Sequence, residues 1–340
     1  MPLWGGRSRR ALVSQAPRLA ALAAPCHSDH EGCYDRGVAP INFSSGFPQR
    51  IVCLTEETTE TLYLLGEDWR IVGISGFTVR PPQARKEKPR VSAFTSAKID
   101  RILALQPDLV LGFSDLQADI AAALVRAGLD VHVFNHRSIQ DILRMIRTLG
   151  GMIGCEAKTH RLIVQLTGGL ARVRERAAAL PSRPRVYFEE WDEPQISGIR
   201  WVSELIGLAG GEDCFSELAV EPLARNRIIR DPLEVARRAP DIILGSWCGK
   251  KFQPREVSAR PGWSEIPAVR EGFVREIKSS IILQPGPAAL TDGVRAIQAV
   301  IEEWAMSSTT QTARQTNVER EDAESAAARI SAEDTESAAR

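Results

Sequence analysis

The sequence predicts an α/β protein with two Rossmann-like lobes, each built on a mostly parallel sheet, joined by one long α-helix. Three observations predict this class. The segment Gln106–Gly112, in which a Pro-Asp pair opens an apolar run, recurs as Ala239–Gly245. Short β-branched runs alternate with helical stretches, which is typical of a parallel sheet covered by helices. Residues 155–180 keep one apolar stripe at helical spacing, which predicts a single long helix between the lobes.

The first lobe is expected over residues 50–154. Ser114 before Gln117 and Ser138 before Asp141 have the spacing of capping boxes. Gly66, Gly128 and Gly150 stand where helices are expected to end. The expected elements are strand 50–54, helix 56–65, strand 71–74, helix 98–105, strand 109–111, helix 115–127, strand 131–134 and helix 139–150.

The second lobe is expected over residues 181–305, because Pro181 and Pro184 end the long helix. Its expected elements are strand 185–188, helices 201–209 and 233–238, strands 242–244 and 273–277, and helix 289–304. Residues 1–49 are expected to be a leader or a disordered arm. Residues 306–340 are expected to be a disordered tail, because they carry too little apolar area to offset chain entropy.

Composition excludes several classes of protein. The 340 residues carry 43 basic and 43 acidic side chains, so the basic excess of a nucleic-acid-binding protein is missing. No apolar run approaches the roughly 18 residues of a membrane helix, so no membrane span is expected. The six cysteines are scattered without a CxxC pair, which predicts no disulfide framework.

The amino-terminal segment leaves the compartment open. Arg7, Arg9 and Arg10 before Ala11–Ala24 resemble the start of a signal peptide. Arg18 interrupts the apolar stretch, however, and Pro25 stands where a small residue is expected before Cys26. Export to the cell envelope and a cytoplasmic form are both compatible with this pattern.

Enzyme signatures are missing from the sequence. It contains no GxGxxG, no GxxxxGK[ST] and no GxSxG, so neither a phosphate-binding loop nor a nucleophile elbow is marked. Asp130–Asn135 nearly matches the DxHxxG pattern of corrinoid enzymes, but it lacks the glycine, and His132 falls inside a predicted strand. We therefore expect no catalytic residue and no cofactor.

A metal site is also not expected. Four residues of metal-binding type precede the first strand, but they lack the close cysteine pairs of tetrahedral zinc sites. They are Cys26, His27, His30 and Cys33.

Ligands of open α/β sheets bind beyond the carboxyl ends of the strands. Aromatic residues and carboxylates are enriched at the expected ends, which suits a large, flat, partly apolar ligand. Core packing is the alternative for each aromatic residue. Trp191 and Trp247 each directly follow an expected strand in a polar turn, which favours ligand contact. The expected strand ends carry Thr55–Glu57, Gly76–Phe77, Phe113–Ser114, Asn135–His136, Glu189–Asp192, Ser246–Lys250 and Gln284–Pro287.

An ordered series of short motifs resembles a known family, the iron-siderophore and cobalamin periplasmic-binding superfamily. Its members are the substrate-binding proteins of ABC importers whose two lobes are joined by a single helix. The resemblance covers about residues 50–304. It is carried by Arg50–Leu54, Ile71–Ser75, Pro81–Pro82, Val91–Ser92, Ile99–Ile102 and Gln106–Val110. The pattern is most similar to cobalamin-binding members in Pro81–Ala84, in Glu189–Asp192 leading to Ile196–Gly198 and Gly210–Gly211, and in Ser246–Lys250.

The resemblance implies binding of cobalamin or a related corrinoid as a ligand, without catalysis. Phe94 and Phe113 stand where the characterised vitamin-binding member has tryptophans. Ser75, Ser114, Glu190 and Lys250 would meet the amide rim of the corrin. The implied ligand-binding residues are Phe77, Phe94, Phe113, Ser114, Glu190, Trp191, Trp247 and Lys250.

The resemblance also implies a location and a partner. It implies a monomer in the periplasm or cell envelope that docks on an ABC importer permease dimer. The docking acid of the first lobe falls on Asp100. The equivalent position of the second lobe is Leu233, so Asp231 or Glu234 would have to substitute.

Two alternatives stay open. The first is a siderophore or haem receptor of the same fold, whose anionic ligand would be met by Arg80, Arg137, Arg200 and Arg227. The second is a cytoplasmic corrinoid-handling protein or enzyme on this scaffold, which is favoured if residues 1–49 are retained.

Overall fold

The computed structural model describes residues 46–308. The chain divides into two units, Met1–Ser44 and Ser45–Arg340, and the described residues all belong to the second. The expected arm and tail lie almost entirely outside the described residues. Within them the predicted fold class is confirmed, with two five-stranded sheets and helices between and around their strands.

Sheet A forms the first lobe. All its strands are parallel, in the order β3-β2-β1-β4-β5. Central strand β1 pairs through Ile51 with Ile71 on one side and with Leu109 on the other. The strands are β1 (Ile51–Cys53), β2 (Ile71–Ser75), β3 (Arg90–Ser92), β4 (Leu109–Phe113) and β5 (Val131–Phe134). The helices are α1 (Glu56–Leu64), η1 (Asp68–Arg70), α2 (Ala84–Glu87), α3 (Ile99–Ala104), η2 (Asp115–Gln117), α4 (Ala118–Arg126) and α5 (Ile139–Met152).

Sheet B forms the second lobe. It runs in the order β10-β9-β6-β7, with β8 also paired to β6, and only β7 is antiparallel to its neighbour. The strands are β6 (Arg185–Asp192), β7 (Gln195–Ser197), β8 (Glu212–Asp213), β9 (Ile242–Gly245) and β10 (Val274–Glu276). The helices are α7 (Arg200–Leu208), α8 (Ser216–Ala219), η3 (Ala224–Asn226), α9 (Leu233–Arg238), α10 (Pro254–Ser258), α11 (Pro267–Arg270), α12 (Ser279–Ile282) and η4 (Ala289–Gly293), which continues as a helix over residues 294–308.

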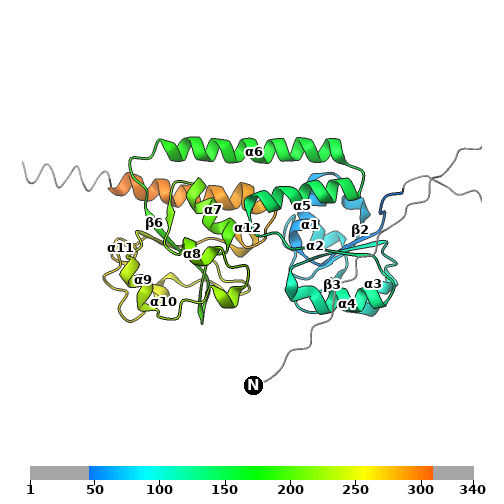
Figure 1. Ribbon diagram of the computed structural model, residues 1–340, viewed down its shortest axis with the longest axis horizontal. Coiled ribbons are helices and arrows are strands. Elements are labelled where there is room, and N and C mark those ends of the chain that lie inside the picture. The colour runs from blue at the N-terminus through cyan, green and yellow to red at the C-terminus, as the bar shows by residue number, and fades with distance from the viewer. Residues whose placement is uncertain (1–45, 309–340) are drawn as a thin grey trace, which may run out of the picture. The chain divides into compact units, whose positions relative to one another are not determined.

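One long helix, α6 (Glu156–Ala178), connects the two sheets in the chain, as its stripe of apolar residues predicts. Its buried side includes Leu162, Leu166, Leu170 and Val173. The helix over residues 294–308 lies beside α6 (Figure 1), and Gln298 Nε2 donates to the Val173 carbonyl at 2.9 Å. The chain therefore returns to the connecting helix after completing the second lobe.

The core follows the two-residue alternation of the strands. In β1, Ile51 and Cys53 face a large cluster that continues through α5 and α6 to Val186 and Phe188 of β6. Val52 and Leu54 face a smaller cluster under α3 and α4. A third cluster covers the other face of sheet B. Parallel strands buried on both faces in this way need apolar residues at nearly every position, which these segments have.

Two local expectations are corrected by the fold. Gly150 does not end α5, which continues to Met152; Gly154, with a φ of 70°, provides the left-handed turn instead. Ser114 does not form the expected box with Gln117, because its Oγ accepts from the Leu116 amide at 3.3 Å. The box at Ser138 is supported, since its Oγ accepts from the Asp141 amide at 3.1 Å.

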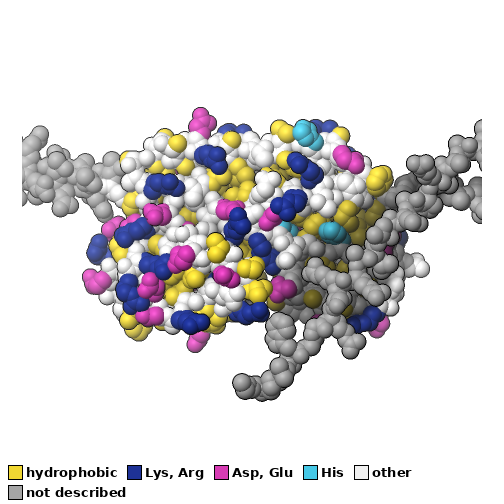
Figure 2. Space-filling view, in the orientation of Figure 1, with side chains coloured by type: hydrophobic (Ala, Val, Ile, Leu, Met, Phe, Trp, Pro, Cys, Tyr) yellow, Lys and Arg dark blue, Asp and Glu magenta, His cyan; other side chains and the backbone are white. Residues whose placement is uncertain are grey.

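The surface agrees with the balanced composition. Basic and acidic side chains are interspersed over the described part of the face in Figure 2, without a large area of one sign. No helix among residues 46–308 has the length and apolar character needed to cross a membrane.

Candidate ligand-binding site

The strand order of sheet A defines where a ligand would bind. The chain builds β1, β2 and β3 in one direction and then β4 and β5 in the other, so the order reverses between β1 and β4. Such a reversal separates the loops after the two strands and opens a crevice at their carboxyl ends. Here those loops carry Glu56 and Glu57 after β1, and Phe113 and Ser114 at the end of β4.

One buried amide side chain holds three of these loops together. Gln117 Oε1 accepts from the Phe113 amide at 2.9 Å. Its Nε2 donates to the Phe94 carbonyl at 3.0 Å and to the Leu54 carbonyl at 3.4 Å. Gly112 leaves room for this side chain, because a Cβ there would lie 2.9 Å from Gln117 Oε1. Sequence patterns indicated only a capping role for Gln117.

The predicted aromatic residues of the first lobe gather at this edge with different exposure. Phe77 is 61% exposed after β2, Phe94 is half-buried after β3, and Phe113 is 8% exposed. The Arg137 guanidinium lies 4.8 Å from the Phe113 ring centroid, and the His136 ring lies 4.8 Å away. Phe77 and Phe94 therefore offer open ring surface, whereas Phe113 is covered by two neighbours.

The second lobe differs from expectation at Trp191. The turn expected after residue 188 is strand, because β6 continues to Asp192 and pairs with β7, with Trp191 opposite Ile196. Trp191 is half-buried, and its Nε1 donates to the Glu193 carbonyl at 2.9 Å. The three-residue strand β7 is too short to be detected by periodicity, which is why the extension of β6 was missed.

Trp247 requires a second correction. It does follow β9, but it is only 3% exposed and belongs to the core cluster under sheet B. Its ring packs on Phe252 with centroids 4.9 Å apart, and its Nε1 donates to Glu189 Oε1 at 3.1 Å. The position after a strand end did not imply an open side chain, because residues 252–263 fold back over it.

The polar residues predicted here already have partners. Arg227, 1% exposed, donates to both oxygens of Glu190 at 2.6 and 3.1 Å. Lys250 donates to Asp192 and lies 4.8 Å from the Trp247 ring centroid. A ligand that contacts Glu190 or Lys250 would therefore compete with these ion pairs.

Direct contacts link the edge of the first lobe to the start of the last helix and to the segment just before it. The His136 ring donates through Nε2 to the Pro285 carbonyl at 2.7 Å. The Ala288 amide donates to Glu60 Oε2 at 3.0 Å, and Arg80 pairs with both Glu60 and Asp292. Burial lowers the pKa of His136 to about 4, so its ring is neutral at physiological pH.

Buried polar atoms without a protein partner mark the same edge. Native structures pair nearly all buried polar groups, so each exception calls for an explanation such as a ligand. Most exceptions within residues 46–308 lie where strands end. After the strands of sheet A they are on Glu56, Glu57, Thr78, Ser92, His136 and Arg137, and after β9 on Ser246; the others are on Thr159, Gln195 and Arg227.

The two carboxyls that follow β1 give the stability a pH dependence. Burial raises the pKa of Glu56 and of Glu57 from about 4.5 to about 7. Between these values the folded protein binds more protons than the unfolded chain, so stability is full below about pH 4.5 and falls as pH rises through 7.

We therefore expect the free energy of unfolding to fall between pH 5 and pH 8, on the order of 1.4 kcal/mol for each unit of pKa shift. Glu57→Gln should flatten this dependence, as measured by urea unfolding at several pH values. The matched control is Glu217→Gln on α8, whose exposed carboxylate pairs with Arg238. A wild-type stability that does not change over this range would contradict the expectation.

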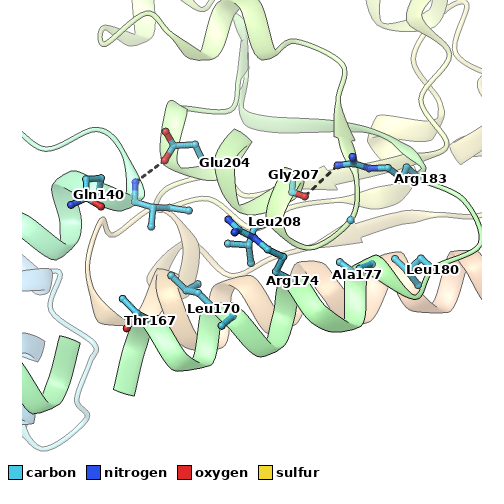
Figure 3. Close-up of a pocket in the computed structure, with 14 residues that line it drawn as sticks. Gln140, Thr167, Leu170, Arg174, Ala177, Leu180, Arg183, Glu204, Gly207 and Leu208 are labelled. Carbon is cyan, nitrogen blue, oxygen red and sulfur yellow. Dashed lines mark hydrogen bonds between the residues drawn. The ribbon is translucent and has the colours of Figure 1, made fainter. Parts of the chain in front are cut away.

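A cavity of about 820 Å³ lies elsewhere, against the connecting helix. Its lining comes from the start of α5, from α6 and from α7, and includes Thr167, Leu170, Arg174, Glu204 and Leu208 (Figure 3). None of the predicted ligand-binding residues lines it. Arg183 and Glu204 are already engaged there, with the Gly207 carbonyl and the Ile139 amide. The cavity and the predicted ligand-binding residues therefore lie in different parts of the fold.

Comparison with known proteins agrees with the two-lobed architecture. A model of the periplasmic binding protein family matches residues 51–281. The chain belongs to this family. The match spans sheet A, α6 and sheet B, including both copies of the repeated Pro-Asp segment.

Individual relatives of this periplasmic binding protein are distant. It is 24% identical to an uncharacterised ABC transporter substrate-binding lipoprotein of Bacillus subtilis, over 74% of this chain and 79% of the relative. It is 24% identical to a vitamin B12-binding protein of Vibrio parahaemolyticus, over 75% of this chain and 87% of that relative. Among solved structures, the periplasmic heme-binding protein RhuT of Roseiflexus, in apo form, superposes with a TM-score of 0.63 at 24% identity. The superposition covers 74% of this chain and 99% of RhuT.

The predicted docking acids of the binding protein differ in their surroundings. Asp100 is exposed in the first turn of α3. Asp231 and Glu234 both pair with Arg237, at 2.6 and 2.8 Å, and Glu234 also pairs with Arg238. Asp231 Oδ1 accepts from the Leu233 amide at 3.0 Å, immediately before α9. The second lobe therefore offers acids that are already partly neutralised.

Proposed function

We propose that this periplasmic binding protein captures cobalamin or a related corrinoid between its lobes and delivers it to an ABC importer permease dimer. The relatives named vitamin B12-binding and ABC transporter substrate-binding proteins support this assignment. The corrin already holds its cobalt, so the protein needs neither a metal site nor a catalytic group. Within residues 46–308, no cluster of histidine, cysteine or acidic residues is arranged to hold a metal ion.

The observation that carries the choice of ligand is the state of the basic residues. An anionic siderophore or haem would need free cations at the strand ends. Arg80 is paired with Glu60 and Asp292, Arg227 with Glu190, and Arg200 with Glu204. Arg137 lies 3.6 Å from Asp115 and covers Phe113. With these charges neutralised, open aromatic surface and uncharged polar groups favour a ligand with amide groups around a flat ring.

The proposal also includes the boundaries of the lobes, the location of the protein, the ligand contacts and the docking residues. The lobes span residues 50–154 and 181–305, joined through 155–180, and the protein acts as a monomer in the periplasm or cell envelope. Phe77, Phe94, Phe113 and Ser114 contact the ligand from the first lobe, and Glu190, Trp191 and Lys250 from the second, where Trp247 supports the loop after β9 from the core. Docking on the permease uses Asp100 of α3 and Asp231 or Glu234 near the start of α9.

Haem is the second candidate, because of His136. Its Nδ1 is buried without a protein partner, and the ring is neutral, which is the form that coordinates iron. A solved structure of similar fold is named as a heme-binding protein. Titration with hemin separates the candidates: a shifted haem absorbance band that is lost in His136→Ala would favour haem over the corrinoid.

The corrinoid assignment is tested by titrating the purified protein with cyanocobalamin. Calorimetry and absorbance should report binding at micromolar concentration. Trp191→Ala should raise Kd about 10- to 100-fold, because it removes part of a ring surface worth about 25 cal/mol per Å². Trp69→Ala is the matched control, since this 56% exposed tryptophan precedes β2 at the opposite end of the strand. Neither heat nor a spectral change with the wild-type protein would exclude the corrinoid.

A further inference from the structure

The first turn of α1 carries two buried carboxyl groups that are only half satisfied. Glu56 is 4% exposed, and its Oε2 accepts from the Val79 amide at 2.6 Å. Glu57 is 1% exposed, and its Oε1 accepts from the Thr55 hydroxyl at 2.5 Å. The other oxygen of each, Glu56 Oε1 and Glu57 Oε2, has no hydrogen-bond partner among the described residues. Each of these two oxygens is shielded from solvent and has no hydrogen bond within the protein, which is an unfavourable arrangement for a buried acceptor.

The next acid on the same helix shows what a purely structural carboxyl looks like here. Glu60 Oε1 accepts from Arg80 Nε at 3.1 Å, and its Oε2 accepts from the Ala288 amide at 3.0 Å. Both of its oxygens are satisfied and its charge faces a cation. The helix amino terminus favours negative charge on Glu56 and Glu57, which lie in the first turn, but it supplies no hydrogen-bond partner to their open oxygens.

The open pair lies where the two lobes face each other. It follows β1 at the reversal of strand order in sheet A. From the second lobe, Gly286 approaches so closely that a Cβ there would lie 2.6 Å from Glu57 Cβ. Cys248, after β9, is exposed, and partial desolvation and then the charges of Glu190 and Glu56 raise the pKa of its thiol. Groups of both lobes therefore surround the pair.

Other buried polar atoms without a hydrogen-bond partner follow strand ends on separate elements. Thr78 Oγ1 follows β2, His136 Nδ1 follows β5, and Ser246 Oγ follows β9. These three residues are at most 4% exposed. Thr159, Gln195 and Arg227 are unpartnered elsewhere, but most such atoms among the described residues lie at or beyond the carboxyl ends of strands in both lobes. Their shared position indicates polar groups of a ligand that enters from the interlobe side.

Burial and the charges around the pair leave about half of each carboxyl protonated at pH 7. No cation among the described residues pairs with Glu56 or Glu57, and the nearby Arg80 is occupied by Glu60 and Asp292. Burial, and then the charge of Glu60, raise the pKa of Glu57 to about 7. Burial also raises the pKa of Glu56 to about 7, and the charges of Glu60 and Glu57 add to this shift. Among the neighbouring groups, Cys53 on β1 titrates near 12 and His136 near 4, and burial raises the pKa of Glu60 above its ordinary 4.5. The pKa of Cys248 lies above its ordinary value of 9.0.

We propose that Glu56 and Glu57 form the recognition site for a primary carboxamide group of the ligand. This inference rests on the proposed corrinoid function and specifies which protein atoms read the amide rim. A protonated carboxyl presents one O–H donor and one acceptor, and a primary carboxamide presents the complementary acceptor and N–H donor. A ligand carboxylate at the same place would meet two acids without a cation and would be repelled. The pair therefore selects amide-bearing ligands over acid-bearing ones.

The test measures cyanocobalamin binding by calorimetry at pH 6 and pH 8, in buffers of different ionisation enthalpy. We expect the wild-type affinity to fall about tenfold between these values, since the protonated fraction of a group with a pKa near 7 falls by about that factor. Binding should also take up protons. Glu56→Gln with Glu57→Gln keeps a donor and an acceptor at each position, so the double variant should bind with little pH dependence and no proton uptake. Glu217→Gln, on the surface of α8, should behave as the wild type.

A second ligand makes the test independent of the variants. Cyanocobalamin in which one peripheral amide has been hydrolysed to a carboxylate should bind the wild type at least tenfold more weakly for the amide that faces the pair, as seen by comparing the separate isomers. Equal affinity for all isomers, or wild-type binding that is independent of pH, would overturn this inference while leaving the corrinoid function standing. No binding of cyanocobalamin to the wild type would overturn both.

Discussion

Replacing Arg260 with methionine should lower the free energy of unfolding by about 3–5 kcal/mol, because it leaves a buried carboxylate without its cation. Glu189 lies in β6 and is fully buried. Arg260 donates to its two oxygens at 2.5 and 2.9 Å. The Tyr187 hydroxyl and the Trp247 indole also donate to it, at 3.0 and 3.1 Å. These two neutral donors do not compensate a full negative charge in a site closed to water.

The matched control for this change is Arg270→Met. Arg270 pairs with Glu271 at 3.5 Å and its side chain is 60% exposed, so its loss should cost less than about 1 kcal/mol. Adding Glu189→Gln to Arg260→Met should recover much of the lost stability, because the amide needs no cation. Urea unfolding followed by circular dichroism measures all of these variants. Similar losses of unfolding free energy for Arg260→Met and Arg270→Met would show that the ion pair between Arg260 and Glu189 is not shielded from solvent.

The same cluster connects stability to the ligand edge. Glu189 of β6 pairs with Gly245 of β9. It also accepts a hydrogen bond from Trp247, which lies in the loop after β9 next to Cys248. We therefore expect changes at Arg260 to weaken cyanocobalamin binding indirectly, by loosening the loop after β9. Trp247 acts in the fold chiefly as a core residue, so we expect its replacement to lower the free energy of unfolding and, through it, to weaken binding.

The second large effect is expected at the contact between α5 and α6. Gly150 lies inside α5, and an added Cβ would fall 1.9 Å from Thr159 Oγ1 and 2.7 Å from Thr159 Cβ. Thr159 is 2% exposed on α6 and cannot swing into solvent. Gly150→Ala should therefore force the two helices apart and cost about 1–3 kcal/mol or more, as overpacking of a core does.

Gly151→Ala is the control one residue away. Nothing lies within 4 Å of a Cβ at Gly151 in the same helix. Alanine there should stabilise the protein by about 0.5–1 kcal/mol, since it restricts the unfolded chain and favours helix. Thermal and urea unfolding of the two variants should give shifts of opposite sign. Two stabilising changes would show that α5 and α6 can move apart at little cost.

The regular parts of the fold were predictable because their signals are local. The apolar stripe of residues 155–180 predicted α6, which spans Glu156–Ala178. The repeated Pro-Asp segment marked β4 and β9, whose apolar runs occupy the same place after a short helix in each lobe. Strands buried on both faces leave a continuous apolar run in the sequence, and this pattern does not depend on which strands pair.

The irregular parts were not predictable, because distant segments decide them. The strand character of Trp191 comes from β7, which pairs with it through residues four to six positions further along. The burial of Trp247 comes from Phe252 and from the cluster around Trp263. Gly150 has the residue type of a helix end, but the close approach of Thr159 explains why a glycine stands there.

The candidate site shows the same division. The sequence located the ends of β1, β2, β4 and β5 to within two residues, because a strand and its end are neighbours in the chain, but it missed the end of β6. It also placed Glu56 and Glu57 at one such end. Only the tertiary structure decided that their carboxyls are buried, that Arg80 serves Glu60 instead, and that one oxygen of each is left open. Charge pairing and desolvation depend on what other segments bring to a side chain, and residue order along the chain does not record them.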